Sequence, residues 1–188
     1  MKRILVLLIV MITIILTQGC DFSNRAGEES ALTENVAKEI MVQAANKFYY
    51  VADHGASLPG SEAVDREIIE IDNEWYIPFW DALDTEEELL AYLEGTFTSS
   101  SILRIKKTLG IIEYEGALYE YYADRGSTEF WGDATVISIE QNGQDAEVLF
   151  DVPFLWIEEP ASHEYTITFL KGPEGEWLLE IEDLWILY

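Results

Sequence analysis

The amino-acid sequence predicts an α+β fold in which about three N-terminal helices pack on a mostly antiparallel β-meander. Three stretches before residue 111 place apolar residues every three or four positions, which is the spacing of a buried helix face. From Ile111 onward apolar and polar residues alternate, as they do in strands with one buried face. Turns that contain glycine separate these later segments, and the chain has no internal repeat.

The first helix is expected to begin after Thr33, whose hydroxyl can cap it, with Glu34 favourably placed in the first turn. Its apolar face recurs at intervals of three and four residues. This face comprises Val36, Ala37, Ile40, Met41, Ala44, Ala45, Phe48 and Val51. His54, Gly55 and the Leu-Pro-Gly turn at 58–60 are expected to end the helix.

Two shorter helices are predicted to follow. Asp84 or Thr85 starts the second helix, and Glu87 or Glu88 three residues later completes a capping box. Its apolar face is expected to comprise Leu89, Leu90, Leu93 and Phe97. The third helix opens in the hydroxyl-rich segment 98–101 and stops at Gly110. Its apolar residues are Ile102, Leu103, Ile105 and Leu109.

The remaining segments read as pairs of strands joined by turns. The expected pairs are 68–71 with 75–77, 112–114 with 117–119, 135–139 with 146–150, and 165–170 with 177–181. The third pair flanks Gln141-Asn142-Gly143, and Asn-Gly between alternating segments is the strongest hairpin signal in the chain. The sequence therefore predicts antiparallel neighbours in sequential order.

The first twenty residues have the pattern of a bacterial lipoprotein signal. Lys2 and Arg3 precede an apolar run, and small residues lead to Cys20, the single cysteine. An uncleaved signal anchor is the alternative, but about thirteen apolar residues are short against the roughly 20 of a membrane span. Leu16 lies one position further from Cys20 than is usual. We expect a signal peptide at 1–19, an acidic tether at 20–31 and a single α+β domain at 32–188, held by a diacylglycerol on Cys20 at the outer face of the cell membrane.

The charge of the chain excludes one class of partner. It has 11 basic and 36 acidic residues and a net charge of −25, and loss of Lys2 and Arg3 with the signal peptide would bring this to −27. Nucleic-acid binding requires a basic surface, so no nucleic-acid partner is expected. A basic protein, a cationic peptide or divalent cations would be attracted, although acidity can also serve solubility alone. With one cysteine, no intramolecular disulfide can form.

The sequence contains no motif of a known catalytic class, so we expect neither an enzyme nor a cofactor. His54 and His163 read as surface or loop histidines, and two histidines are too few for a common zinc site without carboxylates. The acidic group Asp81, Asp84 and Glu86–Glu88 is explained better by a capped, solvated helix start than by calcium binding. The aromatic group Trp75, Phe79 and Trp80 suits either core packing or a ligand platform.

The segment from Trp75 to Ile137 resembles the IseA family of secreted inhibitors of bacterial D,L-endopeptidases, the enzymes that cut peptidoglycan stem peptides. The resemblance rests on Trp75-Tyr76-Ile77-Pro78, Asp84-Thr85-Glu86-Glu87-Glu88-Leu89, Tyr92-Leu93, Thr96-Phe97-Thr98, Gly116-Ala117-Leu118, Ala123-Asp124-Arg125-Gly126-Ser127, Trp131 and Ala134-Thr135-Val136. It implies a non-catalytic protein that blocks a cysteine-peptidase cleft with a projecting loop.

The segment that matches this loop comprises Asp124, Arg125, Gly126, Ser127, Thr128 and Glu129. Gly126 permits close backbone approach, and the two terminal carboxylates offer charge to a cleft. An ordinary turn is the alternative. Two features depart from the family pattern: Arg125 stands where a second glycine is expected, and a lipid anchor is not typical of freely secreted members.

Two other functions remain open on the sequence. The first is a small-molecule-binding or scaffold lipoprotein with a cone-shaped fold like that of nuclear transport factors, which would require a deep apolar pocket lined by Trp75, Tyr76 and strand aromatics. The second is a glycosidase or another enzyme built on carboxylates, which would require two acids facing each other in a cleft.

Overall fold

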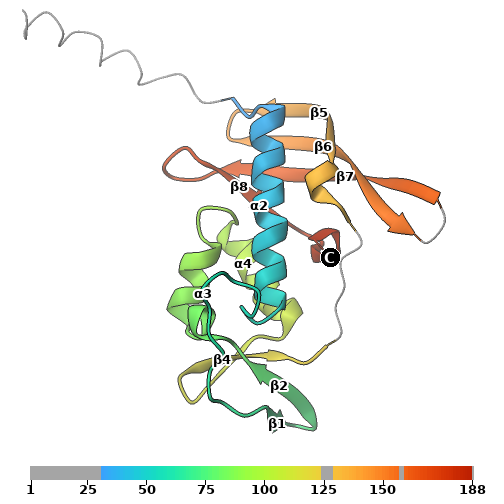
Figure 1. Ribbon diagram of the computed structural model, residues 1–188. Coiled ribbons are helices and arrows are strands. Elements are labelled where there is room, and N and C mark those ends of the chain that lie inside the picture. The colour runs from blue at the N-terminus through green and yellow to red at the C-terminus, as the bar shows by residue number, and fades with distance from the viewer. Residues whose placement is uncertain (1–30, 124–128, 157–158, 188) are drawn as a thin grey trace, which may run out of the picture. The chain divides into compact units, whose positions relative to one another are not determined.

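The computed structural model describes residues 31–123, 129–156 and 159–187 (Figure 1). Three α-helices and two four-stranded antiparallel sheets make up this part of the chain, which confirms the predicted α+β class. The predicted signal peptide, Cys20 and nearly all of the predicted tether lie outside the described residues. Among the residues described, no helix has both the length and the hydropathy that a membrane span requires.

Helix α2 (Glu34–Ala52) begins where the sequence predicts, because the Thr33 hydroxyl accepts a hydrogen bond from the backbone N–H of Val36 at 3.3 Å. Its inward stripe is fully buried and comprises Ala37, Met41, Ala44, Phe48 and Val51. The spacing of three and four residues therefore produced the expected core face.

Helices α3 (Glu86–Leu93) and α4 (Ser99–Leu109) also begin where the sequence predicts. Thr85 and Glu88 form a reciprocal capping box, and the Thr98 hydroxyl accepts from the backbone N–H of Ser101 at 3.2 Å. Gly110 ends α4 at φ 65°, a left-handed conformation that favours glycine. Phe97 was expected on the apolar face of α3, but α3 ends at Leu93, and Phe97 forms an isolated parallel bridge with Leu179 instead.

The first sheet combines strands from both sides of the helical region. It contains β1 (Ile69–Ile71), β2 (Glu74–Pro78), β3 (Ile112–Tyr114) and β4 (Ala117–Tyr121) in the order β1-β2-β4-β3. The central pairing joins β2 to β4, with Tyr76 opposite Tyr121 and Ile77 opposite Glu120. The sequence predicted each of the two hairpins separately. The pairing of β2 with β4, which are separated in the chain by α3 and α4, was not predicted.

The second sheet is a sequential meander of β5 (Thr135–Asn142), β6 (Asp145–Trp156), β7 (Glu159–Lys171) and β8 (Trp177–Glu180). One face supplies most of its large apolar side chains to the core: Ala146, Val148, Phe150, Val152, Ile167, Phe169 and Leu179. Helix α2 packs on this sheet (Figure 1). Three short 3₁₀ helices complete the structure: η1 (Asp81–Leu83), η2 (Trp131–Asp133) and η3 (Leu184–Leu187).

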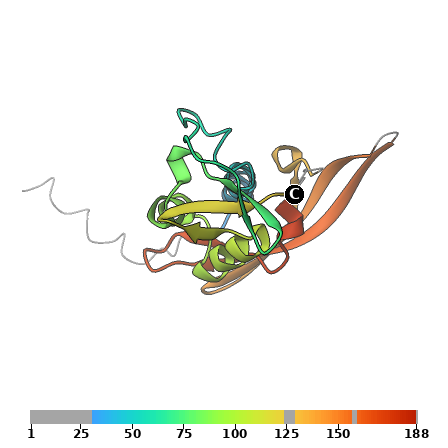
Figure 2. The same cartoon turned by 90° about the horizontal axis from the view of Figure 1, so that it is seen from below.

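Strands β6 and β7 continue past the rest of their sheet as a two-stranded ribbon, which Figure 2 shows extending away from the other strands. Pairing with β5 reaches only Asp151, and pairing with β8 begins only at Thr168, whereas β6 and β7 pair along their whole length. The predicted segments, 146–150 and 165–170, were therefore too short. Pro153 and Pro160 lie in the ribbon. Because proline has no backbone N–H to donate, it is tolerated in strands that have an unpaired edge.

Candidate partner-binding surface

The predicted partner-binding loop connects the two sheets. Strand β4 ends at Tyr121, and η2 begins at Trp131 on the way to β5. Asp124, Arg125, Gly126, Ser127 and Thr128 lie outside the described residues, while Glu129 is described. The structure therefore shows how the two ends of this loop are held, which we call the N-terminal root (121–123) and the C-terminal root (129–131).

The N-terminal root is tied to β2 and carries exposed tyrosines. The Tyr122 N–H donates to the carbonyl of Trp75 at 2.8 Å, and the Tyr121 ring makes an edge contact with Tyr76 at 6.0 Å between centroids. A hydrogen bond to the Glu74 carboxylate, and then the charge of that carboxylate, raise the pKa of Tyr121. The Tyr122 side chain is 61% exposed, so it is presented to solvent from a fixed backbone.

The backbone of the C-terminal root is bound to the β6–β7 ribbon. Glu129 forms an isolated antiparallel bridge with Phe154, and the Phe130 N–H donates to the carbonyl of Pro153 at 2.8 Å. The Tyr165 hydroxyl donates to Glu129 Oε1 at 3.1 Å. Burial, followed by the charge of Glu129, raises the pKa of Tyr165 to about 12. The Glu129 carboxylate is thus bonded within the protein at the base of the loop.

Aromatic side chains of the C-terminal root and of the β6–β7 ribbon form a cluster. Phe154 and His163 stack at 4.1 Å between centroids, and Trp131 contacts both Phe150 at 5.6 Å and Tyr165 at 5.7 Å. The Trp131 indole N–H also donates to the carbonyl of Ile186 at 2.8 Å. His163 therefore belongs to the aromatic cluster that packs next to the C-terminal root, a position for which the sequence offered no signal.

A small hollow lies between the C-terminal root and α2. Its volume is about 260 Å³, and it is lined by Val42, Ala45, Asn46, Tyr49, Glu129, Phe130, Trp131, Gly132 and Leu187. The Phe130 side chain is 42% exposed at its rim. Each root of the loop therefore carries an exposed aromatic residue, Tyr122 on one and Phe130 on the other.

The acidic group at the start of α3 is used for local structure. Arg66 pairs with Asp84 at 2.7 Å, and Lys106 pairs with Glu86 at 2.5 Å. The Asp81 carboxylate accepts the backbone N–H of Glu62 at 2.7 Å. With Glu88 in the capping box, these contacts support the interpretation of this group as a capped helix start.

The aromatic group around β2 does not form one platform. Phe79 is completely buried and belongs to the core, whereas Trp75 is 54% exposed and Trp80 is half-buried. The hollows on α2 are lined by neither Trp75 nor Tyr76, the residues that the small-molecule-binding alternative would place in a deep pocket.

The burial of Glu120 was not predicted from the sequence. Glu120 on β4 has no exposed surface, and its carboxylate lies 3.5 Å from Nδ1 of His54, in the turn after α2. Glu120 points to the same side of the sheet as its cross-strand neighbour Ile77. The alternation of Leu118 and Glu120 along β4 was the available signal, since both belong to the inward-facing set.

Comparison with known proteins identifies one family. Residues 28–182, nearly the whole chain, match the family described as IseA DL-endopeptidase inhibitor. No curated protein matches the chain.

Proposed function

The chain belongs to the IseA DL-endopeptidase inhibitor family, and from that premise we propose that it blocks the cleft of a cell-wall peptidase with the loop Asp124–Glu129. We propose further that the protein is not itself catalytic. Its place of action would be the outer face of the cell membrane, to which a diacylglycerol on Cys20 would hold it.

The observation that supports the loop best is the anchoring of both of its roots. The N-terminal root is hydrogen-bonded to β2, and the C-terminal root is hydrogen-bonded to β6 and Tyr165. Only the five residues 124–128 separate these described roots. A binding segment whose ends are already ordered loses less conformational freedom when a partner binds, so more of the contact free energy appears as affinity.

The two roots also carry the residue types that dominate protein interfaces. Tyr122 is 61% exposed and Phe130 is 42% exposed, although phenylalanine is among the residues most often buried. Central aromatic residues provide most of the binding free energy in many complexes. The proposed contact surface is therefore the loop together with Tyr122 and Phe130.

The charge of the chain would act on the rate of association. A net charge of −25 attracts a peptidase with a basic rim and repels anionic wall polymers. Because this attraction is screened over about 10 Å at 0.1 M salt, inhibition should weaken as the salt concentration rises. Contacts from the aromatic roots should persist in salt.

Inhibition of a D,L-endopeptidase that cleaves stem peptides is the direct test. The full chain should inhibit at stoichiometric concentration, and Tyr122→Ala should weaken inhibition by roughly tenfold to a hundredfold, as expected for an interface aromatic. Tyr114→Ala is the matched control, because Tyr114 is an exposed tyrosine of β3, outside the two roots of the loop. Equal inhibition by both variants would contradict the proposed surface, and no inhibition by excess wild-type protein would reject the function.

The lipid anchor has a separate test. Wild-type protein should sediment with membranes and be released by detergent, whereas Cys20→Ala should be released from the cell or retained with an uncleaved signal. Metabolic labelling with a fatty acid gives the independent readout. A labelled Cys20→Ala variant, or an unlabelled wild type, would reject lipidation at this residue.

A further inference from the structure

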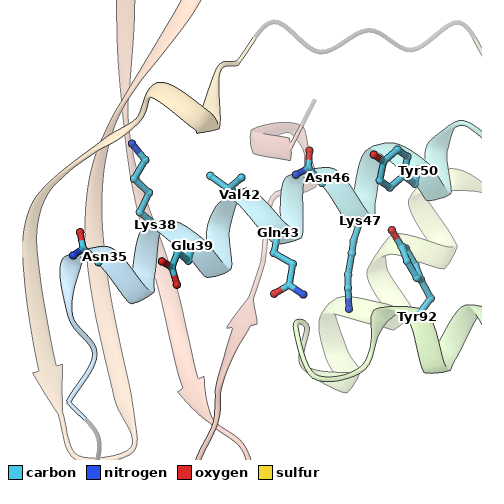
Figure 3. Close-up of a pocket in the computed structure, with 9 residues that line it drawn as sticks. All are labelled: Asn35, Lys38, Glu39, Val42, Gln43, Asn46, Lys47, Tyr50 and Tyr92. Carbon is cyan, nitrogen blue, oxygen red and sulfur yellow. The ribbon is translucent and has the colours of Figure 1, made fainter. Parts of the chain in front are cut away.

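A groove lined mainly by polar residue types runs along α2 (Figure 3), and two of its residues, Val42 and Asn46, also line the small hollow beside the C-terminal root. Its volume is about 580 Å³, which lies within the range of ligand sites. Eight lining residues follow helical spacing on α2, and Tyr92 of α3 closes one end: Asn35, Lys38, Glu39, Val42, Gln43, Asn46, Lys47, Tyr50 and Tyr92. From Asn35 to Tyr50 the helix rises roughly 22 Å.

The composition of this stripe is unusual for an exposed helix face in so acidic a chain. It contains three carboxamides and two lysines, but only one carboxylate, Glu39. Asn is a poorer helix former than Glu or Lys, so Asn35 and Asn46 do not serve helix stability. Within the described part of the chain, neither of these amide side chains, nor that of Gln43, has a hydrogen-bond partner. Each can both donate and accept.

Lys47 occupies the inner end of the groove. Its ammonium donates to the carbonyl of Glu94 at 3.4 Å and lies 5.3 Å from the centroid of the Tyr92 ring. Figure 3 shows its side chain and the ring of Tyr92 beside each other. Burial lowers the pKa of Lys47, and burial likewise raises the pKa of Tyr92 to about 12. The ammonium is therefore partly removed from water and has no carboxylate partner among the described residues.

Among the described residues, the two lysines of the groove and Lys107 lack the carboxylate partner that three other basic residues have. Arg66, Arg104 and Lys106 each pair with a carboxylate. Lys38 and Lys47 make no such pair among the residues that the structure describes, despite the large excess of acids in the chain. A partly desolvated ammonium gains free energy when a carboxylate binds to it with a charge-assisted hydrogen bond.

We propose that the groove on α2 binds a short extended peptide whose carboxylate pairs with Lys47. The carboxamides of Asn35, Gln43 and Asn46 would pair with backbone amides of the peptide, which also donate and accept. At roughly 3.3 Å per residue, the length of the groove accommodates about six residues. Binding of a peptide in this groove requires no peptidase.

Titration of the full chain with a blocked alanine hexapeptide that carries a glutamate next to each end tests the proposal, because Lys47 lies at one end of the groove. Backbone amide resonances of α2 should shift in a saturable way, and the corresponding glutamine peptide should bind roughly tenfold more weakly because it lacks the charge. Equal binding of the two peptides would overturn the assignment of Lys47 to a carboxylate. A failure of both peptides to shift α2 would overturn the site.

Substitutions locate the contact. Lys47→Met should weaken binding of the glutamate peptide roughly tenfold, whereas Lys107→Met, at an exposed lysine of α4, should leave it unchanged. If circular dichroism shows that Lys47→Met does not fold, the comparison of the glutamate and glutamine peptides on wild-type protein still tests whether a carboxylate is bound. Equal affinities for folded Lys47→Met and Lys107→Met would overturn the proposal. Because no enzyme is present in this experiment, its outcome is separate from that of the inhibition assay.

Discussion

The two four-stranded sheets of this protein have the same antiparallel pairing but different interiors. The second sheet has long strands and a continuous apolar face that includes Val148, Phe150 and Phe169, all without exposed surface. The first sheet has strands of three to five residues and encloses a carboxylate, Glu120, on its inner side.

The solvent-facing sides of the two sheets also differ in how many large apolar side chains they expose. Three aromatic residues in strands of the first sheet are exposed by more than a third: Trp75, Tyr114 and Tyr121. Among the described residues of the second sheet, the exposed large apolar side chain is Ile137, which lies at a bulge of β5. The comparison indicates that the second sheet buries a continuous apolar face, whereas the first sheet leaves aromatic side chains in contact with solvent. The predicted inhibitory loop begins where the first sheet ends.

The largest effect is expected from an apolar deletion in the second sheet. Phe150→Ala removes a fully buried ring that also contacts Trp131, so the free energy of unfolding should fall by about 3–5 kcal/mol. Tyr114→Ala on the first sheet should cost less than about 1.5 kcal/mol, since its ring is 41% exposed. Urea unfolding of both variants measures the difference, and equal losses would refute the division between the sheets.

The next effect concerns the contact between His54 and Glu120 at the first sheet. His54→Ala leaves the carboxylate of Glu120 buried without its imidazole neighbour, and we expect a loss of about 2–3 kcal/mol. This is less than for a fully enclosed pair because the His54 side chain is 17% exposed. Adding Glu120→Gln to His54→Ala should restore part of the loss. A double variant no more stable than the single one would show that the two residues act independently.

The smallest effect is a pH dependence of stability that arises from Tyr165 on β7, whose hydroxyl donates to Glu129 in the C-terminal root. Its pKa is raised in the folded protein from 10.0 to about 12, so folding favours the neutral phenol. This contribution is complete below pH 10 and is lost as the pH rises towards about 12. Tyr165→Phe should therefore flatten the fall in the free energy of unfolding over that interval.

At neutral pH the same variant loses the hydrogen bond to Glu129, at a cost of about 1 kcal/mol. Urea unfolding at several pH values measures both effects. An unchanged slope in Tyr165→Phe would assign the pH dependence to other groups, such as Tyr92, whose pKa is also raised to about 12. It would also remove Tyr165 from the description of the loop support.

Local features of the fold were predictable because their interactions span only a few residues. The caps at Thr33, Thr85 and Thr98 and the left-handed Gly110 each involve groups within four or five positions. The hairpin around Gly143 depends in the same way on backbone conformation at the turn. The family was also recognisable from residues quoted along the chain, and the match over residues 28–182 confirms it.

The candidate sites were predictable only in part. The loop at 124–129 followed from the family resemblance, but its support by Phe154, His163 and Tyr165 brings together segments more than twenty residues apart. The groove on α2 was also missed, since its residues read individually as ordinary solvated positions. Their shared stripe becomes a groove only because Tyr92 of α3 stands beside it.

The sequence by itself determined the class of the fold, the starts of the helices and the family, because caps, turns and hydrophobic periods act over short distances. Tertiary structure decided that β2 pairs with β4, that β6 and β7 extend together beyond their sheet, and that Glu120 is enclosed. These outcomes depend on which surfaces exclude water together, and that is settled by all the elements at once rather than by any one segment.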